Sequence, residues 1–173
     1  PRPRAEPVTS DGFSPDGALI ASCGRDHTLH CWNVQTDKET SVVFPGGGIP
    51  SCVVFSPDGG VLAVGVATCV RFYSPTVMLF NNVSQSSWDV HESSNVGTSK
   101  NVSCIAFSPD GSLMAVAGMH QLLAVRSIET GAVSILTGHI AGDVIGVTFS
   151  PDGDRLFSGD EEGQLLIWQS MQH

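Results

Sequence analysis

The pentapeptide FSPDG occurs four times in this chain, at residues 13–17, 55–59, 107–111 and 149–153. In each copy the phenylalanine ends an apolar run, and the four residues after it have the composition of a tight turn. Proline presets φ at the second turn position, aspartate tolerates the third, and glycine adopts a left-handed conformation at no steric cost. An apolar run of strand type follows each copy at once. The pentapeptide therefore predicts a turn between two strands, repeated four times.

The spacing of the copies indicates a repeat architecture. They lie 42, 52 and 42 residues apart, and a period of about 40–45 residues is typical of propeller blades. Each repeat contains four short runs of strand type and no helical periodicity. We therefore predict an all-β fold, a β-propeller segment of about four four-stranded antiparallel blades. The predicted blades are residues 8–44, 51–83, 102–136 and 143–170.

The longer spacing, with its ten extra residues, indicates an insertion. We place it at residues 84–100, after a fourth strand near 77–80, on a loop between the second and third blades. It contains Trp88 and His91, and an aromatic side chain beside charged residues is a good candidate for a binding hot spot. The alternative is a serine-rich excursion with Trp88 folded back on the blade.

Two longer stretches resemble the WD-repeat family of β-propellers. They are FSPDGALIASCGRDHTLHCWNVQTD at 13–37 and TGHIAGDVIGVTFSPDGDRLFSGDEEGQLLIWQ at 137–169. The second and third repeats depart from the family pattern, because Tyr73 and Arg126 stand where it has tryptophan. The resemblance implies the propeller fold, but this family has many unrelated functions.

The resemblance also implies a buried chain of hydrogen bonds in each complete blade, formed by a histidine, a serine or threonine, an acid and a tryptophan. In the fourth repeat these are His139, Ser158, Glu162 and Trp168, with glutamate at the place of the family's aspartate. In the first repeat the matching residues are Ser22, Asp26 and Trp32.

Several features favour a partial or open propeller fragment. The chain begins PRPRAEPVTS without an initiator methionine, and the last repeat lacks a fourth strand. Asp11 and Gly12 fall where the first strand favours apolar residues, so we expect irregularity there. An open arc has unpaired edges. The alternatives are a ring of four blades and two chains that pair into a ring of eight.

Composition limits the classes of partner. The net charge of −9 argues against direct binding to nucleic acid or to anionic membranes. No apolar run approaches the roughly 18 residues of a membrane helix. Five cysteines, an odd number, lie mostly in apolar runs, which favours a reducing compartment, the cytosol or the nucleus.

The sequence predicts no catalytic, cofactor-binding or metal-binding residues. FSPDG is not the G-x-S-x-G motif of a nucleophilic serine, and Gly46–Gly48 lacks the lysine and helix of a phosphate-binding loop. The spacing of Cys23, His27, His30 and Cys31 fits no familiar zinc site.

We therefore expect a non-enzymatic scaffold that binds proteins or peptides within a larger assembly. Its candidate contact residues lie on predicted turns or on the insertion: Arg25, His27, Trp88, His91, His120 and Glu161. One alternative is a reader of a basic or modified peptide in a nuclear or RNA-processing complex, because an acidic chain suits a basic ligand. Others are a ciliary, centriolar or microtubule-associated protein, by family analogy, and a propeller enzyme. The partner can also be a second copy of the chain or the remainder of a parent propeller.

Overall fold

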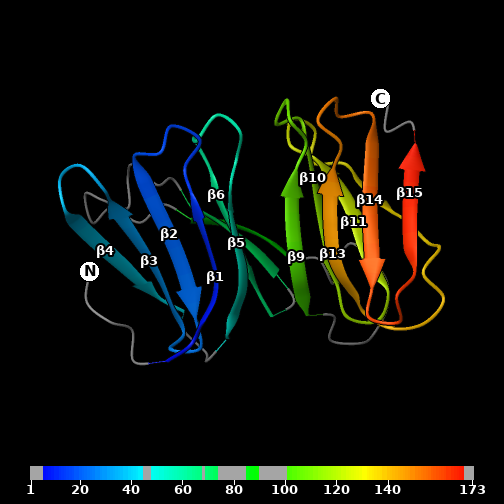
Figure 1. Cartoon of the computed structure of the whole chain (residues 1–173), viewed down its shortest axis with the longest axis horizontal. Coiled ribbons are helices and arrows are strands. Elements are labelled where there is room, and N and C mark those ends of the chain that lie inside the picture. Colours follow the sequence, from blue (N-terminus) through cyan, green and yellow to red (C-terminus); the bar gives the residue numbers. More distant parts are fainter. Residues whose placement is uncertain (1–5, 45–47, 68, 74–84, 90–100, 170–173) are drawn as a thin grey trace. The chain divides into compact units, whose positions relative to one another are not determined.

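The computed structural model describes residues 6–44, 48–67, 69–73, 85–89 and 101–169. Every regular element in these ranges is a β-strand, and the strands form four antiparallel sheets. The chain divides into two compact units, Pro1–Trp88 and Asp89–His173 (Figure 1). No helix in the described ranges is long and apolar enough to cross a membrane. The all-β prediction is confirmed.

Unit 1 contains sheets 1 and 2, each with its strands in sequence order. Sheet 1 consists of β1 (Val8–Phe13), β2 (Leu19–Gly24), β3 (Thr28–Asn33) and β4 (Lys38–Val43). Sheet 2 consists of β5 (Pro50–Phe55), β6 (Leu62–Val66), β7 (Cys69–Tyr73) and β8 (Gln85–Asp89).

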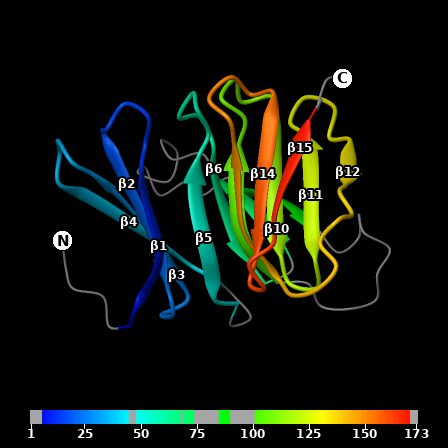
Figure 2. The ribbon, with the colours of Figure 1, turned by 45° about the vertical axis from the view of Figure 1, so that its right-hand side comes forward.

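Unit 2 contains sheets 3 and 4 (Figure 2). Sheet 3 consists of β9 (Val102–Phe107), β10 (Leu113–Gly118), β11 (Leu122–Ser127) and β12 (Val133–Ile135). Sheet 4 consists of β13 (Val144–Phe149), β14 (Arg155–Asp160) and β15 (Leu165–Gln169). In the described part of the chain, sheet 4 therefore has three strands, and neighbouring strands pair in order in both sheets.

The SPDG turn joins the first two strands of every sheet, and its serine organises it. In sheet 3 the Ser108 hydroxyl donates to the Asp110 carboxylate at 2.6 Å and accepts the backbone N–H of Leu113 at 2.9 Å. The Gly111 N–H donates to the Ser108 carbonyl, and Gly111 has a φ of 75°, a left-handed value that favours glycine. The turn closes as the sequence predicts.

The other three copies of the turn have the same bonds. In each, the serine hydroxyl donates to the aspartate and accepts the backbone N–H five residues later. The glycines have φ values between 71° and 80°. The repeat of sequence is therefore a repeat of three-dimensional structure.

Each unit has its own hydrophobic core between its two sheets. In unit 1, Cys23 and Leu29 of sheet 1 belong to one buried cluster with Phe55 and Leu62 of sheet 2. A hydrogen bond also joins the two sheets: the Ser10 hydroxyl of sheet 1 accepts the backbone N–H of Val53 in sheet 2 at 3.1 Å. Unit 2 has an equivalent core, in which sheet 3 packs on sheet 4.

Two details correct the sequence-based expectations. The residues Gln85–Asp89 form β8, the fourth strand of sheet 2, so they are not part of a loop insertion. The rest of that predicted insertion, and the strand predicted at 77–80, lie outside the described residues. In β1 the irregularity is a register shift between Val8 and Ser10, whereas Asp11 and Gly12 pair regularly with β2.

The SPDG turns make stability depend on acidity. Hydrogen bonds from the hydroxyl of Ser108, then from the amide and hydroxyl of Ser112, lower the pKa of Asp110 from 3.8 to about 2. The pKa values of Asp16, Asp58 and Asp152 are lowered in the same way, first by the serine of each turn. The unfolded chain therefore binds protons before the folded chain does. This stabilisation is fully present above about pH 5 and is lost as the pH falls toward about 2.

We expect Asp110→Asn to lower the Tm at pH 7 by about 2–4 °C. The variant should also show a smaller fall in Tm between pH 5 and pH 2.5, because one carboxylate of depressed pKa is gone. Thermal unfolding followed by circular dichroism measures both effects. Glu129→Gln, at an exposed carboxylate outside the SPDG turns, is the control and should follow the wild type. A wild-type Tm that stays constant over this range contradicts the prediction.

Candidate functional site

A continuous chain of hydrogen bonds runs through the interior of unit 2. The Trp168 indole N–H donates to the Ser158 hydroxyl oxygen at 2.8 Å. The same oxygen lies 2.8 Å from Nε2 of His139, and Nδ1 of His139 lies 2.8 Å from a carboxylate oxygen of Asp160. With a neutral imidazole, Ser158 donates to Nε2 and the Nδ1–H donates to Asp160, so every polar group has a partner.

Asp160 also ties this chain to the β14–β15 turn. Its second carboxylate oxygen accepts the backbone N–H groups of Gln164 at 2.8 Å and of Glu162 at 3.1 Å. Burial acts to raise the pKa of Asp160, but the hydrogen bonds from His139 and from these two backbone groups together lower it below 3.8. The carboxylate is therefore ionised inside the unit, and these hydrogen bonds stabilise its charge.

The acid of this chain is Asp160, and the prediction of Glu162 in that role is wrong. Alternation along β14 places Ser158 and Asp160 on the same buried face. Glu162 lies in the turn after the strand and is exposed. The pattern Ser-x-Asp at a strand end would have identified the correct acid.

Serine, histidine and aspartate are also the residues of a hydrolase triad, but this set cannot act as one. Ser158 is buried, and its oxygen already accepts the Trp168 N–H. A nucleophile needs access to substrate and a nearby group that stabilises an oxyanion. The arrangement instead fixes β14, β15 and the segment before β13 to one another.

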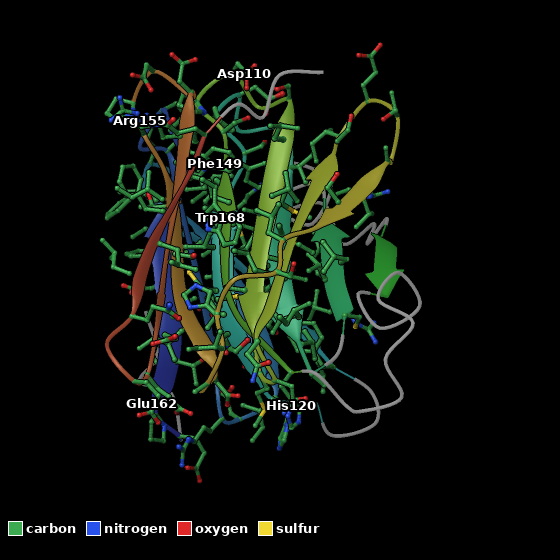
Figure 3. The ribbon with its side chains drawn as sticks, turned by 90° about the vertical axis from the view of Figure 1, so that its right-hand side faces the viewer. Asp110, His120, Phe149, Arg155, Glu162 and Trp168 are labelled. Atoms are coloured by element: carbon green, nitrogen blue, oxygen red, sulfur yellow. The ribbon has the colours of Figure 1, made fainter. Side chains whose placement is uncertain are left out.

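A second polar network lies at the exposed end of unit 2, where the β10–β11 and β14–β15 turns meet the segment before β13. The His120 N–H donates to the Asp143 carboxylate at 2.8 Å. The Asp143 N–H donates to a carboxylate oxygen of Glu161 at 3.2 Å, and the Glu161 N–H donates to the Asp143 carbonyl at 3.1 Å. Figure 3 shows His120 and Glu162 toward this end and Asp110 and Arg155 toward the other. We call this end, with residues 119–121, 140–143 and 161–163, the turn surface.

The sequence model named "WD domain, G-beta repeat" matches residues 7–33, 86–124 and 131–169, more than half of the chain. The chain belongs to the WD-repeat family. The match that begins at residue 86 starts within β8, which agrees with the structure in assigning this strand to the repeat pattern.

Three curated relatives indicate the range of proteins that contain such repeats. The chain is 31% identical over 162 residues to "WD repeat-containing protein SL1-17" of Schistosoma mansoni, covering 93% of the chain and 50% of that protein. It is 28% identical to human "Telomerase Cajal body protein 1", covering 91% of the chain and 29% of that protein. It is 27% identical to "Transcription initiation factor TFIID subunit 5" of Caenorhabditis elegans, covering 94% and 23%. The chain thus spans half or less of the length of these relatives.

In the first WD repeat the matching tryptophan donates to a different acceptor. The Trp32 indole N–H donates to the carboxylate of Asp37, in the β3–β4 turn, at 3.1 Å. Asp26 accepts the backbone N–H and the hydroxyl of Thr28 at 3.1 and 2.6 Å, so it stabilises its own turn. Ser22 lies on β2 opposite His30. The sequence pattern predicts the tryptophan but not its partner Asp37.

The predicted contact residues of the WD chain lie in separate parts of the structure. His120 and Glu161 both lie on the turn surface of unit 2 and are joined through Asp143. Arg25 and His27 share the β2–β3 turn of unit 1, where His27 has a φ of 59° and its Nδ1 lies 3.3 Å from the Gly48 carbonyl oxygen. Trp88 lies on β8, and its side chain is not described. His91 lies outside the described residues.

No group of three or more His, Cys, Asp or Glu side chains suited to a metal ion occurs among the described residues. His30 is instead paired with Glu39, with 2.7 Å between Nδ1 and a carboxylate oxygen. Cys31 is buried, and burial raises the pKa of its thiol to about 11, so it stays protonated and unreactive at neutral pH. His30 and Cys31 therefore have structural roles in sheet 1.

We expect Asp160→Asn to lower the Tm by several degrees, because the variant loses the ionised acceptor for His139 and for the turn. Glu162→Gln should shift the Tm by no more than about 1 °C, since an exposed surface substitution is usually close to neutral. Thermal unfolding of the two variants against the wild type decides between the two acids. Equal effects of both substitutions contradict the assignment to Asp160.

Trp168→Phe removes the N–H donor of the same chain and keeps the aromatic ring. We expect a loss of about 1–2 kcal/mol in the free energy of unfolding, because the buried Ser158 oxygen loses one hydrogen bond. Trp32→Phe is the matched control, since the Trp32 N–H donates to an exposed carboxylate and its removal should cost less. Urea denaturation gives both values, and a larger cost at Trp32 contradicts the prediction.

Proposed function

We propose that this WD-repeat chain is a non-enzymatic interaction module that binds a protein or peptide partner within a larger assembly, through the turn surface of unit 2. The observation that supports this proposal is the network of His120, Asp143 and Glu161. It fixes three separate segments to each other while their side chains remain at the surface. A preorganised surface loses little entropy on binding.

The chemistry of the turn surface suggests what it binds. Ile140 is 84% exposed, which is the largest exposure of any large apolar side chain among the described residues. It follows the buried His139 directly, so the hydrogen-bond chain beneath it holds its backbone in place. Carboxylates of Glu161 and Glu162 belong to the same surface. An apolar anchor beside acidic groups suits a partner segment that contains an apolar side chain flanked by basic residues.

A more specific form of this proposal is a reader of basic or modified peptides in a nuclear or RNA-processing complex. Two observations favour it, the net charge of −9 and relatives whose names include a telomerase Cajal body protein and a subunit of a transcription initiation factor. An intracellular location, in the cytosol or the nucleus, belongs to the same proposal. Binding to a second copy or to further blades of a longer protein involves sheet faces rather than turns.

The experiment compares the partners retained by the wild-type chain and by two variants, measured by quantitative mass spectrometry after affinity capture. Ile140→Asp should reduce the retained partner at least tenfold, because it adds a charge at the apolar anchor. Arg155→Ala, at the opposite end of unit 2, is the matched control and should retain the partner (Figure 3). Equal retention by both variants contradicts the assignment of the turn surface.

The peptide form has its own measurement, fluorescence anisotropy with a short synthetic peptide rich in lysine and arginine and containing one leucine. We expect binding that weakens as salt rises from 50 to about 300 mM, because screening shortens the range of charge attraction. The double variant Glu161→Gln/Glu162→Gln should lose most of that salt dependence. Binding that is unaffected by salt and by this variant contradicts the basic-peptide form and leaves the broader proposal to the capture experiment.

A further inference from the structure

The β10–β11 turn, which belongs to the turn surface, has a strained backbone. The Leu122 N–H donates to the Met119 carbonyl at 3.3 Å, which closes a β-turn whose central residues are His120 and Gln121. Their φ values are 56° and 57°. Positive φ at both central positions is the pattern of a type I′ turn, which favours asparagine, aspartate and glycine. Histidine and glutamine have a Cβ that crowds the backbone in this conformation, so both add strain.

The rest of unit 2 avoids this kind of strain. Elsewhere in its described residues, every position of positive φ is a glycine: Gly111, Gly131, Gly142, Gly153 and Gly163. Glycine has no Cβ and adopts this conformation at little cost. Local backbone preference therefore does not explain why His120 and Gln121 occupy the β10–β11 turn.

Neighbouring segments hold the strained turn in place through its backbone. The His120 N–H donates to the Asp143 carboxylate at 2.8 Å, and the Met119 N–H donates to the Asn101 carbonyl at 2.9 Å. Neither bond uses the side chain of His120 or Gln121. Both of these residues are exposed, and Figure 3 shows His120 at the end of unit 2. Strained residues that their surroundings hold in place occur mostly at functional sites.

His120 and Gln121 also differ chemically from the rest of the turn surface. Among residues 119–121, 140–143 and 161–163, they alone have side chains that donate hydrogen bonds. Its ionised carboxylates only accept, so they suit the basic side chains of a partner but not its backbone carbonyl oxygens. Those oxygens are free acceptors in an extended segment, whereas in a helix they are already bonded.

We propose that His120 and Gln121 are contact residues that donate hydrogen bonds to backbone carbonyl oxygens of an extended peptide bound at the turn surface. This inference rests on the proposed function, because it takes the same surface and a basic segment with one apolar residue as its ligand. It adds the two residues that recognise the main chain of that segment. It also explains why the turn has two residues that are unfavourable for its backbone: their side chains act on the ligand and not on the fold.

The double variant His120→Gly/Gln121→Gly tests the inference, because Gly-Gly suits a type I′ turn and has no side-chain donors. We expect the Tm to rise by about 2–4 °C as the strain is removed. The dissociation constant for a basic peptide with one leucine, kept extended by flanking prolines, should rise at least tenfold, because two hydrogen bonds are lost. Thermal unfolding and fluorescence anisotropy measure these effects. Hydrogen exchange at the Leu122 amide checks that the turn stays closed.

Ala67→Gly is the matched control. Ala67 lies in the β6–β7 turn of unit 1 and has a φ of 48°, so glycine should relieve strain there as well. This variant should raise the Tm and leave the affinity for the peptide unchanged. Weaker binding by the double variant then reflects the lost side chains and not the gain in stability.

A second peptide tests the acceptor. A helical peptide of the same charge, also with one leucine, should bind the wild type at least tenfold more weakly than the extended peptide. Equal binding of the two peptides, or equal binding of the extended peptide by the wild type and the double variant, overturns this inference and leaves the proposed function standing. A wild type that binds neither peptide overturns this inference together with the basic-peptide form of the proposed function. A double variant whose Tm falls while its turn stays closed overturns the assignment of strain.

Discussion

One serine hydroxyl per repeat determines how these sheets begin. In each SPDG turn it donates to the aspartate and accepts the backbone N–H five residues later, so it joins the two ends of the turn. The phenylalanine just before the turn and the residues just after it are then fixed in register. Because all four turns have the same hydrogen bonds, equivalent residues occupy equivalent faces of their sheets.

The hydrogen-bond chain of unit 2 adds a second level of order to this frame. Sheets alone leave the connecting segments free to vary, but Asp160 links the interior histidine to the backbone of the β14–β15 turn. Asp143 then links that turn to its neighbour through His120 and Glu161. One connected network of hydrogen bonds thus runs from the core to the surface. It holds the backbone of the turn surface against the interior of unit 2.

The sequence was most informative where chemistry is local. The SPDG turns, the strands that flank them and the pair Ser158–Trp168 follow from short patterns whose geometry depends on adjacent residues. It was misleading where the hydrogen-bond partner of a side chain depends on the face of the sheet that the side chain occupies, which a short motif does not specify. Glu162 fits the family pattern, yet alternation along β14 selects Asp160. The indole N–H of Trp32 donates to Asp37 in the β3–β4 turn, which the family pattern does not include. The sequence does not predict the strand β8, because its residues, QSSWD, lack the alternation of apolar side chains by which strands are recognised.

The serine of each SPDG turn precedes a proline, and Ser-Pro is the minimal motif that proline-directed protein kinases recognise. In the folded chain all four hydroxyl oxygens are already engaged, each within hydrogen-bonding distance of an aspartate. A phosphate at that oxygen adds up to two negative charges beside an existing carboxylate and removes the acceptor for a strand amide. Phosphorylation at any of the four serines would therefore break hydrogen bonds that close its own turn.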